Sequence, residues 1–295
     1  MKQSSKKYIN SKNIYCLYYK LPNGVHMFLK GNSENPNIKN PPSDDAYPII
    51  SSLFINKRFN DYEITINSLS LIILELISQN QIRCEITRDE SYKVGSKLTT
   101  DDLDVMKNIT LRIASSGELK TSQTKAINLL KKMNKTKKFN LKDMLKFSGK
   151  TAIANAFLQD YSEFKNAVES ENNYADKNYR DILVNSKLTP EGKELKKQWK
   201  NYQDYLISKK LTEKYPPESI EENDAQLIYG ACFDIEKDAF DLRKNNTELS
   251  NFIDKDGYKF LNIIFNNAVS NVSQKRRGNG IFYGVNDKYT IPGGG

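Results

Sequence analysis

The chain of 295 residues has very little histidine and cysteine, which removes several classes of chemistry. Its cysteines, Cys16, Cys84 and Cys232, lie far apart with no neighbouring histidine, so neither a disulfide framework nor a zinc site is expected. The single histidine, His26, follows a turn signal and has no cluster of carboxylates or cysteines beside it. Most Ser/His and Cys/His mechanisms are thereby excluded. We therefore predict no catalytic residue, no bound metal and no cofactor, and we expect a protein that is not an enzyme.

The sequence also lacks a long apolar run. No segment approaches the roughly 18 consecutive apolar residues that a spanning helix requires, and the mean hydropathy is -0.66. The first ten residues, MKQSSKKYIN, are basic but have no apolar stretch behind them, so no secretory signal is expected. These features predict a soluble protein of the cytoplasm.

Positive charge is present in excess and is concentrated in one region. The chain has 45 Lys and Arg against 36 Asp and Glu, a formal charge of +9. Residues 120–150 contain ten lysines and one acid, Asp143, whereas residues 213–240 contain eight acids and only Lys214 and Lys237 as bases. Two surfaces of opposite sign are the expected consequence.

Local patterns predict a mainly α (α+β) protein with an N-terminal β-hairpin, a winged-helix-like unit and then a helical domain. The hairpin is indicated by two β-rich runs, Ile14–Tyr19 and Val25–Leu29, around Pro22-Asn23-Gly24. The expected segments are 1–30 (hairpin), 31–47 (linker), 48–120 (winged-helix-like unit), 121–180 (basic helical segment), 181–273 (C-terminal helical domain) and 274–295 (flexible tail).

The winged-helix-like unit is predicted from the order of its apolar segments. Two helices, at 49–55 and 68–77, precede a hairpin whose strands would be 82–86 and 92–98. The second helix, SLSLIILELI, has no basic residue and is apolar nearly all round, so we expect it to be buried rather than to read DNA bases.

Helical signals dominate after Thr99. Apolar residues recur at helical spacing between Ile153 and Val168 and again between Phe260 and Val272. Thr189-Pro190 is the sharpest helix start in the chain, because proline at the first helical position has no amide to leave unpaired.

Two segments of the C-terminal half resemble a known family. LTPEGKELKKQWKNYQDYLISKKL (Leu188–Leu211) and PPESIEENDAQLIYGACFDIEKDAF (Pro216–Phe240) resemble the cytoplasmic C-terminal region of the predicted membrane proteins grouped as domain of unknown function 2207 (DUF2207). The segments that follow the order seen in the family are Ile66–Ile86, Thr189–Tyr205, Tyr229-Gly230-Ala231 and Phe265–Gly295. The resemblance brings no active site. It implies a domain that works at the cytoplasmic face of a membrane in its relatives and that, in this chain, either docks there through a partner or has been freed from the membrane.

Two short motifs look functional, but their spacing argues against the function. Ser148-Gly149-Lys150-Thr151 ends like a phosphate-binding loop, yet the position that needs a second glycine is Met144, so we expect a turn between helices. Asp254-Lys255-Asp256-Gly257 resembles part of a calcium loop, but Ile263 occupies the position of the closing glutamate. An Asp-Gly turn before the last helix is the better interpretation.

The lysine-rich region is therefore the main candidate for an interaction site. The sequence favours an unidentified protein partner, with a possible peripheral contact to anionic membrane, and a nucleic-acid-binding winged-helix regulator is the alternative. The candidate interaction residues are Lys131, Lys132, Lys135, Lys137, Lys138, Lys275, Arg276 and Arg277.

Overall fold

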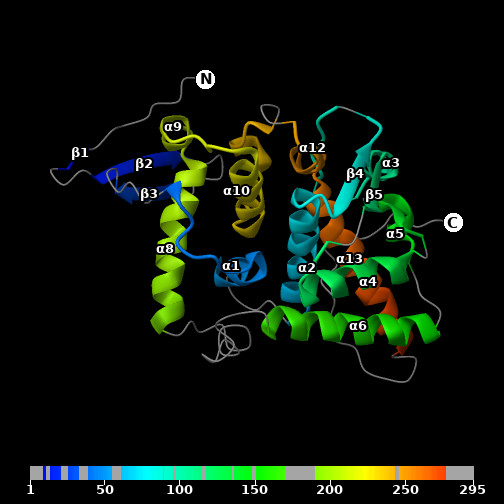
Figure 1. Ribbon diagram of the computed structural model, residues 1–295. Coiled ribbons are helices and arrows are strands. Elements are labelled where there is room, and N and C mark those ends of the chain that lie inside the picture. Colours follow the sequence, from blue (N-terminus) through cyan, green and yellow to red (C-terminus); the bar gives the residue numbers. More distant parts are fainter. Residues whose placement is uncertain are drawn as a thin grey trace. The chain divides into compact units, whose positions relative to one another are not determined.

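The contacts of the computed structural model divide the chain into two compact units, coloured along the sequence in Figure 1. The first unit is Met1–Asp44 with Pro190–Pro217, and the second is Asp45–Thr189 with Glu218–Gly295. Residues 190–217 thus group with the N-terminal residues, whereas the sequence suggested one segment from 181 to 273. The structure describes residues 9–10, 14–20, 26–32, 39–54, 61–88, 90–95, 98–114, 117–134, 136–147, 151–170, 190–242 and 246–276.

The strands of the first unit form an antiparallel sheet of β1 (Ile9–Asn10), β2 (Ile14–Lys20) and β3 (His26–Asn32), in that order. Strand β2 pairs with β3 from one end to the other, with Tyr18 opposite Phe28. The N-terminal hairpin predicted from the sequence is confirmed by this pairing.

The helices of the first unit are α8 (Pro190–Ile207) and α9 (Lys209–Lys214). Helix α8 begins at the predicted proline, and its apolar stripe includes the buried rings of Trp199, Tyr202 and Tyr205. The Tyr205 hydroxyl donates a hydrogen bond to a backbone carbonyl beyond α9, so the aromatic stripe also fixes the turn after α8.

Most of the described residues of the second unit are helical, which confirms the mainly α prediction. Helix α2 occupies the centre of this unit and contacts α1, α4, α10, α12 and α13 (Figure 1). The helical elements are α1 (Tyr47–Phe54), α2 (Asp61–Ser78), α3 (Thr100–Lys107), α4 (Thr121–Met133), α5 (Leu141–Leu145), α6 (Thr151–Ser170), α10 (Ile220–Cys232), the 3-10 turn η3 (Lys237–Ala239), α12 (Glu248–Asp254) and α13 (Gly257–Arg276).

Helix α2 is buried all round, as its sequence predicts. Leu69, Ile73 and Leu76 are completely inaccessible to solvent, and the apolar residues between them are nearly so. A helix that is apolar on every side is stable only in the interior of a domain. This helix therefore has no outer face with which to read a nucleic acid.

A second antiparallel sheet lies at one end of this unit, with strand order β4 (Ile82–Ile86), β5 (Ile109–Ile113) and β6 (Lys138–Asn140). Helix α3 connects β4 to β5, and α4 connects β5 to β6. Residues on one side of the sheet, including Leu111 and Phe139, are completely buried.

The predicted hairpin of residues 82–86 with 92–98 is wrong. Strand β4 pairs with β5 instead, and residues 90–95 are not a strand. The backbone donors of this segment are used elsewhere: the Tyr92 amide donates to the carbonyl of Asp254 (3.3 Å), and the Val94 amide donates to the Asp256 carboxylate (2.5 Å). The local hairpin fails because a distant corner of the chain satisfies these groups.

That corner belongs to a group of polar contacts, which we call the polar junction: the backbone of Tyr92 and Asp254 with the side chains of Lys237 and Asp256. The Lys237 ammonium lies 3.5 Å from the Asp256 carboxylate and donates to the carbonyl oxygens of Tyr92 and Asp254. Lys237 and Asp256 are both buried. The junction therefore joins the 90–95 segment, η3 and the α12–α13 corner.

The Asp-Gly turn expected before the last helix is present. Asp256 has a positive φ of 55°, and its carbonyl accepts the Phe260 amide (3.0 Å) as α13 begins. Gly257 is required there because a Cβ atom would lie 2.5 Å from the Phe252 ring. Helix α10 ends at Cys232, two residues before Asp234, which adopts a positive φ of 55°.

No helix among the described residues combines the length and the apolar character needed to cross a lipid bilayer. Several sequence-based expectations fall on residues outside the described ones: the turn at 148–150 and the tail from 277 onward.

Candidate functional site

The solvent-facing side of the second sheet carries a row of three cations, one from each strand. The register places Arg83 of β4 opposite Arg112 of β5, and Arg112 opposite Lys138 of β6. Their side chains are 50%, 62% and 60% exposed. We call the outward positions of this sheet the cationic sheet face: Arg83, Glu85, Thr110, Arg112, Lys138 and Asn140.

Two carboxylates balance part of this charge. Glu85 accepts a hydrogen bond from Lys138 (2.7 Å) and lies 3.9 Å from Arg112. The hydrogen bond and the charge of Lys138 lower the pKa of the Glu85 carboxyl. Arg83 pairs with Glu248 of α12 at 3.0 Å. Each acid is therefore already engaged by a base of the face.

The two edges of this sheet are closed at the points where an added strand would pair. At the β4 edge, the Cys84 amide donates to the Glu248 carboxylate (2.7 Å). At the β6 edge, the Lys138 carbonyl accepts hydrogen bonds from Thr136 (2.5 Å) and Asn134 (3.3 Å). These contacts favour binding of a partner to the face of the sheet over addition of a strand at its edges.

The structure separates the predicted interaction residues by role. Lys132 bridges α4 and α6, since its ammonium lies 2.6 Å from Asp160 and donates to the Ala156 carbonyl (3.0 Å). Lys131 and Lys137 are exposed and form no ion pair with any described residue. Only Lys138 among the predicted residues belongs to the cationic sheet face.

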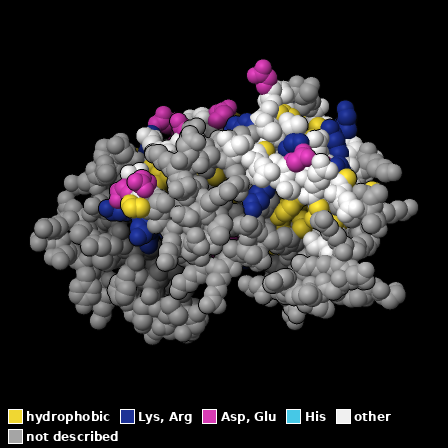
Figure 2. Space-filling view, turned by 90° about the horizontal axis from the view of Figure 1, so that it is seen from below, with side chains coloured by type: hydrophobic (Ala, Val, Ile, Leu, Met, Phe, Trp, Pro, Cys, Tyr) yellow, Lys and Arg dark blue, Asp and Glu magenta, His cyan; other side chains and the backbone are white. Residues whose placement is uncertain are grey.

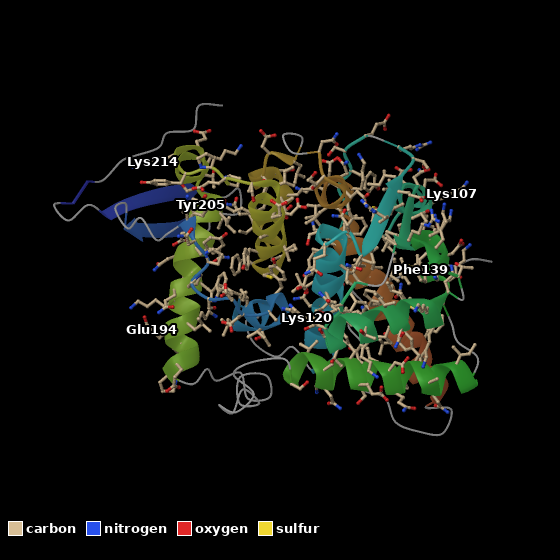
Figure 3. All side chains as sticks on the ribbon, viewed as in Figure 1. Lys107, Lys120, Phe139, Glu194, Tyr205 and Lys214 are labelled. Atoms are coloured by element: carbon tan, nitrogen blue, oxygen red, sulfur yellow. The ribbon has the colours of Figure 1, made fainter. Side chains whose placement is uncertain are left out.

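The remaining predicted residues cannot be assigned a contact. Lys135 and Arg277 lie outside the described residues, and Lys275 and Arg276 are in the last turn of α13 at positions whose side chains are not described. In Figure 2, Lys and Arg side chains gather at the side of the second unit where α3 and α5 lie in Figure 1. Lys107, labelled in Figure 3, is another exposed lysine at this end.

Sequence reasoning missed Arg112 because residues 109–113 lie in a region where helical signals dominate. Their sequence, ITLRI, alternates apolar and polar residues, which is the signal of a half-buried strand. In the structure Leu111 is buried and Arg112 exposed, as that alternation dictates. The alternation of these five residues was the signal from which the strand, and the exposure of Arg112, could have been predicted.

Two further features of the second unit concern the binding of small ligands. Among the described residues, no group of three or more His, Cys, Asp or Glu side chains is arranged to hold a metal ion. A hollow of about 50 Å³ lies between α10 and the α12–α13 corner and is lined mostly by apolar atoms, with Leu227, Ile235 and Phe240 among its residues. Such a volume accommodates no more than about one or two water molecules.

The thiol of Cys84 provides a test of the environment beside the cationic sheet face. Burial and the neighbouring carboxylates of Glu248 and Glu85 raise its pKa far above the usual value. With Cys16 and Cys232 replaced by serine, we expect alkylation of Cys84 by iodoacetamide to be slow at pH 8, because the thiolate is the nucleophile.

The pH dependence of the alkylation rate gives the decisive measurement. We expect the alkylation rate to keep rising above pH 9. Glu248→Gln should accelerate the reaction by lowering the pKa of the thiol, whereas the control Glu194→Gln, in the first unit, should not. A rate profile with a midpoint near the ordinary cysteine pKa of about 8.5 would contradict this environment.

Comparison with known proteins yields no match to a family model, to a curated protein or to a solved structure. The resemblance to DUF2207 stays a prediction, and the residues themselves carry the functional argument.

Proposed function

We propose that this chain is a non-enzymatic interaction module that binds an acidic partner through the cationic sheet face and two exposed lysines of the basic region, Lys131 and Lys137. The observation that carries the proposal is the alignment of three exposed cations from three strands on one sheet face. A protein with an acidic surface is the first partner class, and contact at the cytoplasmic face of a membrane is the role that the DUF2207 resemblance adds.

The buried ionisable groups support an interaction role because they hold helices together. Glu75 of α2 pairs with Lys120 before α4 (3.0 Å), and Asp224 of α10 accepts a hydrogen bond from Thr247 before α12 (2.8 Å). Lys237 and Asp256 likewise serve the polar junction. These groups have structural partners, so the exposed charges are the ones available to a ligand.

A nucleic acid is the second candidate partner, and one observation favours it. The large hydrophobic side chains that are exposed among the described residues are Ile207 and Ile220, and neither belongs to the second sheet or to the helices beside it. Protein interfaces usually contain apolar anchors, whereas nucleic-acid interfaces are polar and strongly positive. The sequence-based alternative was a nucleic-acid-binding winged-helix regulator, but binding of a nucleic acid to the sheet face does not require a winged helix.

The proposal is tested with a charge-reversal variant, Lys131→Glu/Lys137→Glu/Lys138→Glu, which spares the structural Lys132. A photo-reactive residue introduced at Thr110 should cross-link partners to the wild type and lose them in the variant, because each reversal repels an acidic surface. Sedimentation with anionic liposomes tests the membrane role in parallel. Thermal unfolding should be unchanged, and identical cross-linking by wild type and variant would refute the proposal.

A further inference from the structure

The row of cations on the sheet face places like charges directly opposite one another. Residues directly opposite each other on antiparallel strands have Cβ atoms about 5 Å apart, and like charges at such positions are destabilising. Arg112 is opposite a cation on both sides, Arg83 and Lys138. A face that keeps three like charges in register suits an anion with several regularly spaced charges.

The carboxylates of Glu85 and Glu248 do not cancel all of the positive charge on this face and next to it. Glu85 is shared between Arg112 and Lys138, and Glu248 is used by Arg83. Lys137, directly before β6, adds a further charge without an ion pair among the described residues. The whole chain is also basic, with an isoelectric point near 9.1, which favours a polyanionic partner.

The other outward residues indicate which polyanion fits. Thr110 and Asn140 are small and polar, and none of the six positions of the face holds an aromatic ring on which an unpaired base can stack. Single strands are typically held by such stacking, whereas a duplex presents only phosphates and groove edges. Helix α2, the predicted second helix of the wing, is buried and cannot enter a groove.

We propose that the cationic sheet face binds the phosphodiester backbone of duplex DNA, without reading its sequence. This inference rests on the proposed interaction function and names the partner class. Arg83, Arg112 and Lys138 supply the contacts, and Glu85 opposes them by occupying two of these cations.

The first measurement is the fluorescence anisotropy of a labelled duplex of about 20 base pairs as a function of salt. Three phosphate contacts predict a slope of about -2.7 in log K against log salt, so that affinity falls roughly 40-fold between 50 and 200 mM salt. Duplexes of different sequence should bind equally, and a single strand of the same length should bind more weakly.

Two variants test the face itself. Arg112→Ala/Lys138→Ala should weaken duplex binding roughly 10- to 100-fold near 100 mM salt and reduce the slope by about 1.8, because two phosphate contacts are lost. Glu85→Gln should tighten binding by about twofold or more, since it releases both cations and removes a charge that repels phosphate. A purely structural role for these residues predicts no such gain.

Matched variants on α8 control for the change in net charge. Lys193→Ala/Lys197→Ala removes the same charge as the double variant, and Glu194→Gln matches Glu85→Gln; all three residues are exposed. Each control should change the affinity by less than about twofold, because these residues are not part of the cationic sheet face and a change in net charge alone is largely screened by salt.

A labelled poly-glutamate peptide separates this inference from the proposed function. If the peptide binds and responds to the variants while duplex DNA does not bind, or does not respond, the DNA inference is overturned and the acidic-partner function stands. If neither probe responds to the sheet-face variants, both fail. The inference is supported if duplex binding is weakened by Arg112→Ala/Lys138→Ala and strengthened by Glu85→Gln.

Discussion

Replacement of Lys237 by alanine is expected to lower the free energy of unfolding by about 3–5 kcal/mol, the typical cost of removing one partner of a buried ion pair. Lys237 is 8% exposed, and its ammonium serves the Asp256 carboxylate and two backbone carbonyls of the polar junction. The variant leaves the carboxylate without its closest cation and the carbonyls without a donor. Urea unfolding followed by circular dichroism measures the loss.

A set of related variants identifies the cause. Lys237→Met keeps the length of the side chain and should be nearly as destabilised, whereas Lys237→Met/Asp256→Asn should recover part of the loss because no unpaired charge remains. Lys197→Ala, at an exposed position of α8, should change stability by less than about 0.5 kcal/mol. A loss below about 1 kcal/mol in Lys237→Ala would show that the junction does not stabilise the fold.

The second large effect is expected for Phe139→Ala, which should cost about 3–5 kcal/mol of unfolding free energy. Phe139 is completely buried, lies opposite Leu111, and is the central residue of the three-residue strand β6 (Figure 3). The substitution leaves a cavity beneath the sheet. Because β6 is so short, its pairing with β5 depends on this one side chain.

Thermal and urea unfolding measure the loss, and Phe139→Leu should lose less because it fills more of the space. The adjacent Lys138→Ala, on the opposite side of the sheet, should be close to wild type in stability. If Phe139→Ala and Lys138→Ala were equally stable, the assignment of the two faces would be wrong. Duplex binding separates them further, since Lys138→Ala weakens binding without unfolding the protein.

Elements that depend on local signals could be predicted from the sequence. The hairpin around Pro22-Asn23-Gly24, the start of α8 at Pro190 and the burial of α2 each follow from residues close together in the chain. The second sheet could not be predicted in this way, because β4 and β5 are separated by α3 and the local alternative, residues 92–98, is also rich in strand-forming residues. Only the tertiary contacts of Tyr92 and Val94 decide between the two partners.

The candidate site was partly predictable for a related reason. The sequence reports how many lysines lie in residues 120–150, but not which acids reach them from elsewhere. Lys120 is paired with Glu75 of α2 and Lys132 with Asp160 of α6, so these lysines are structural. The row on the sheet face, in contrast, joins Arg83, Arg112 and Lys138 from three strands, and no local pattern connects them.

The polar junction also constrains the order in which the second unit folds. The Val94 amide and the Asp256 carboxylate that accepts it are 162 residues apart in the chain. Contacts of such separation carry a large loop-closure cost and are associated with slow folding. During synthesis, residues 90–95 therefore lack these partners until the α12–α13 corner has left the ribosome, and in a nascent chain that ends before residue 254 the amides of this segment are hydrogen-bonded to water.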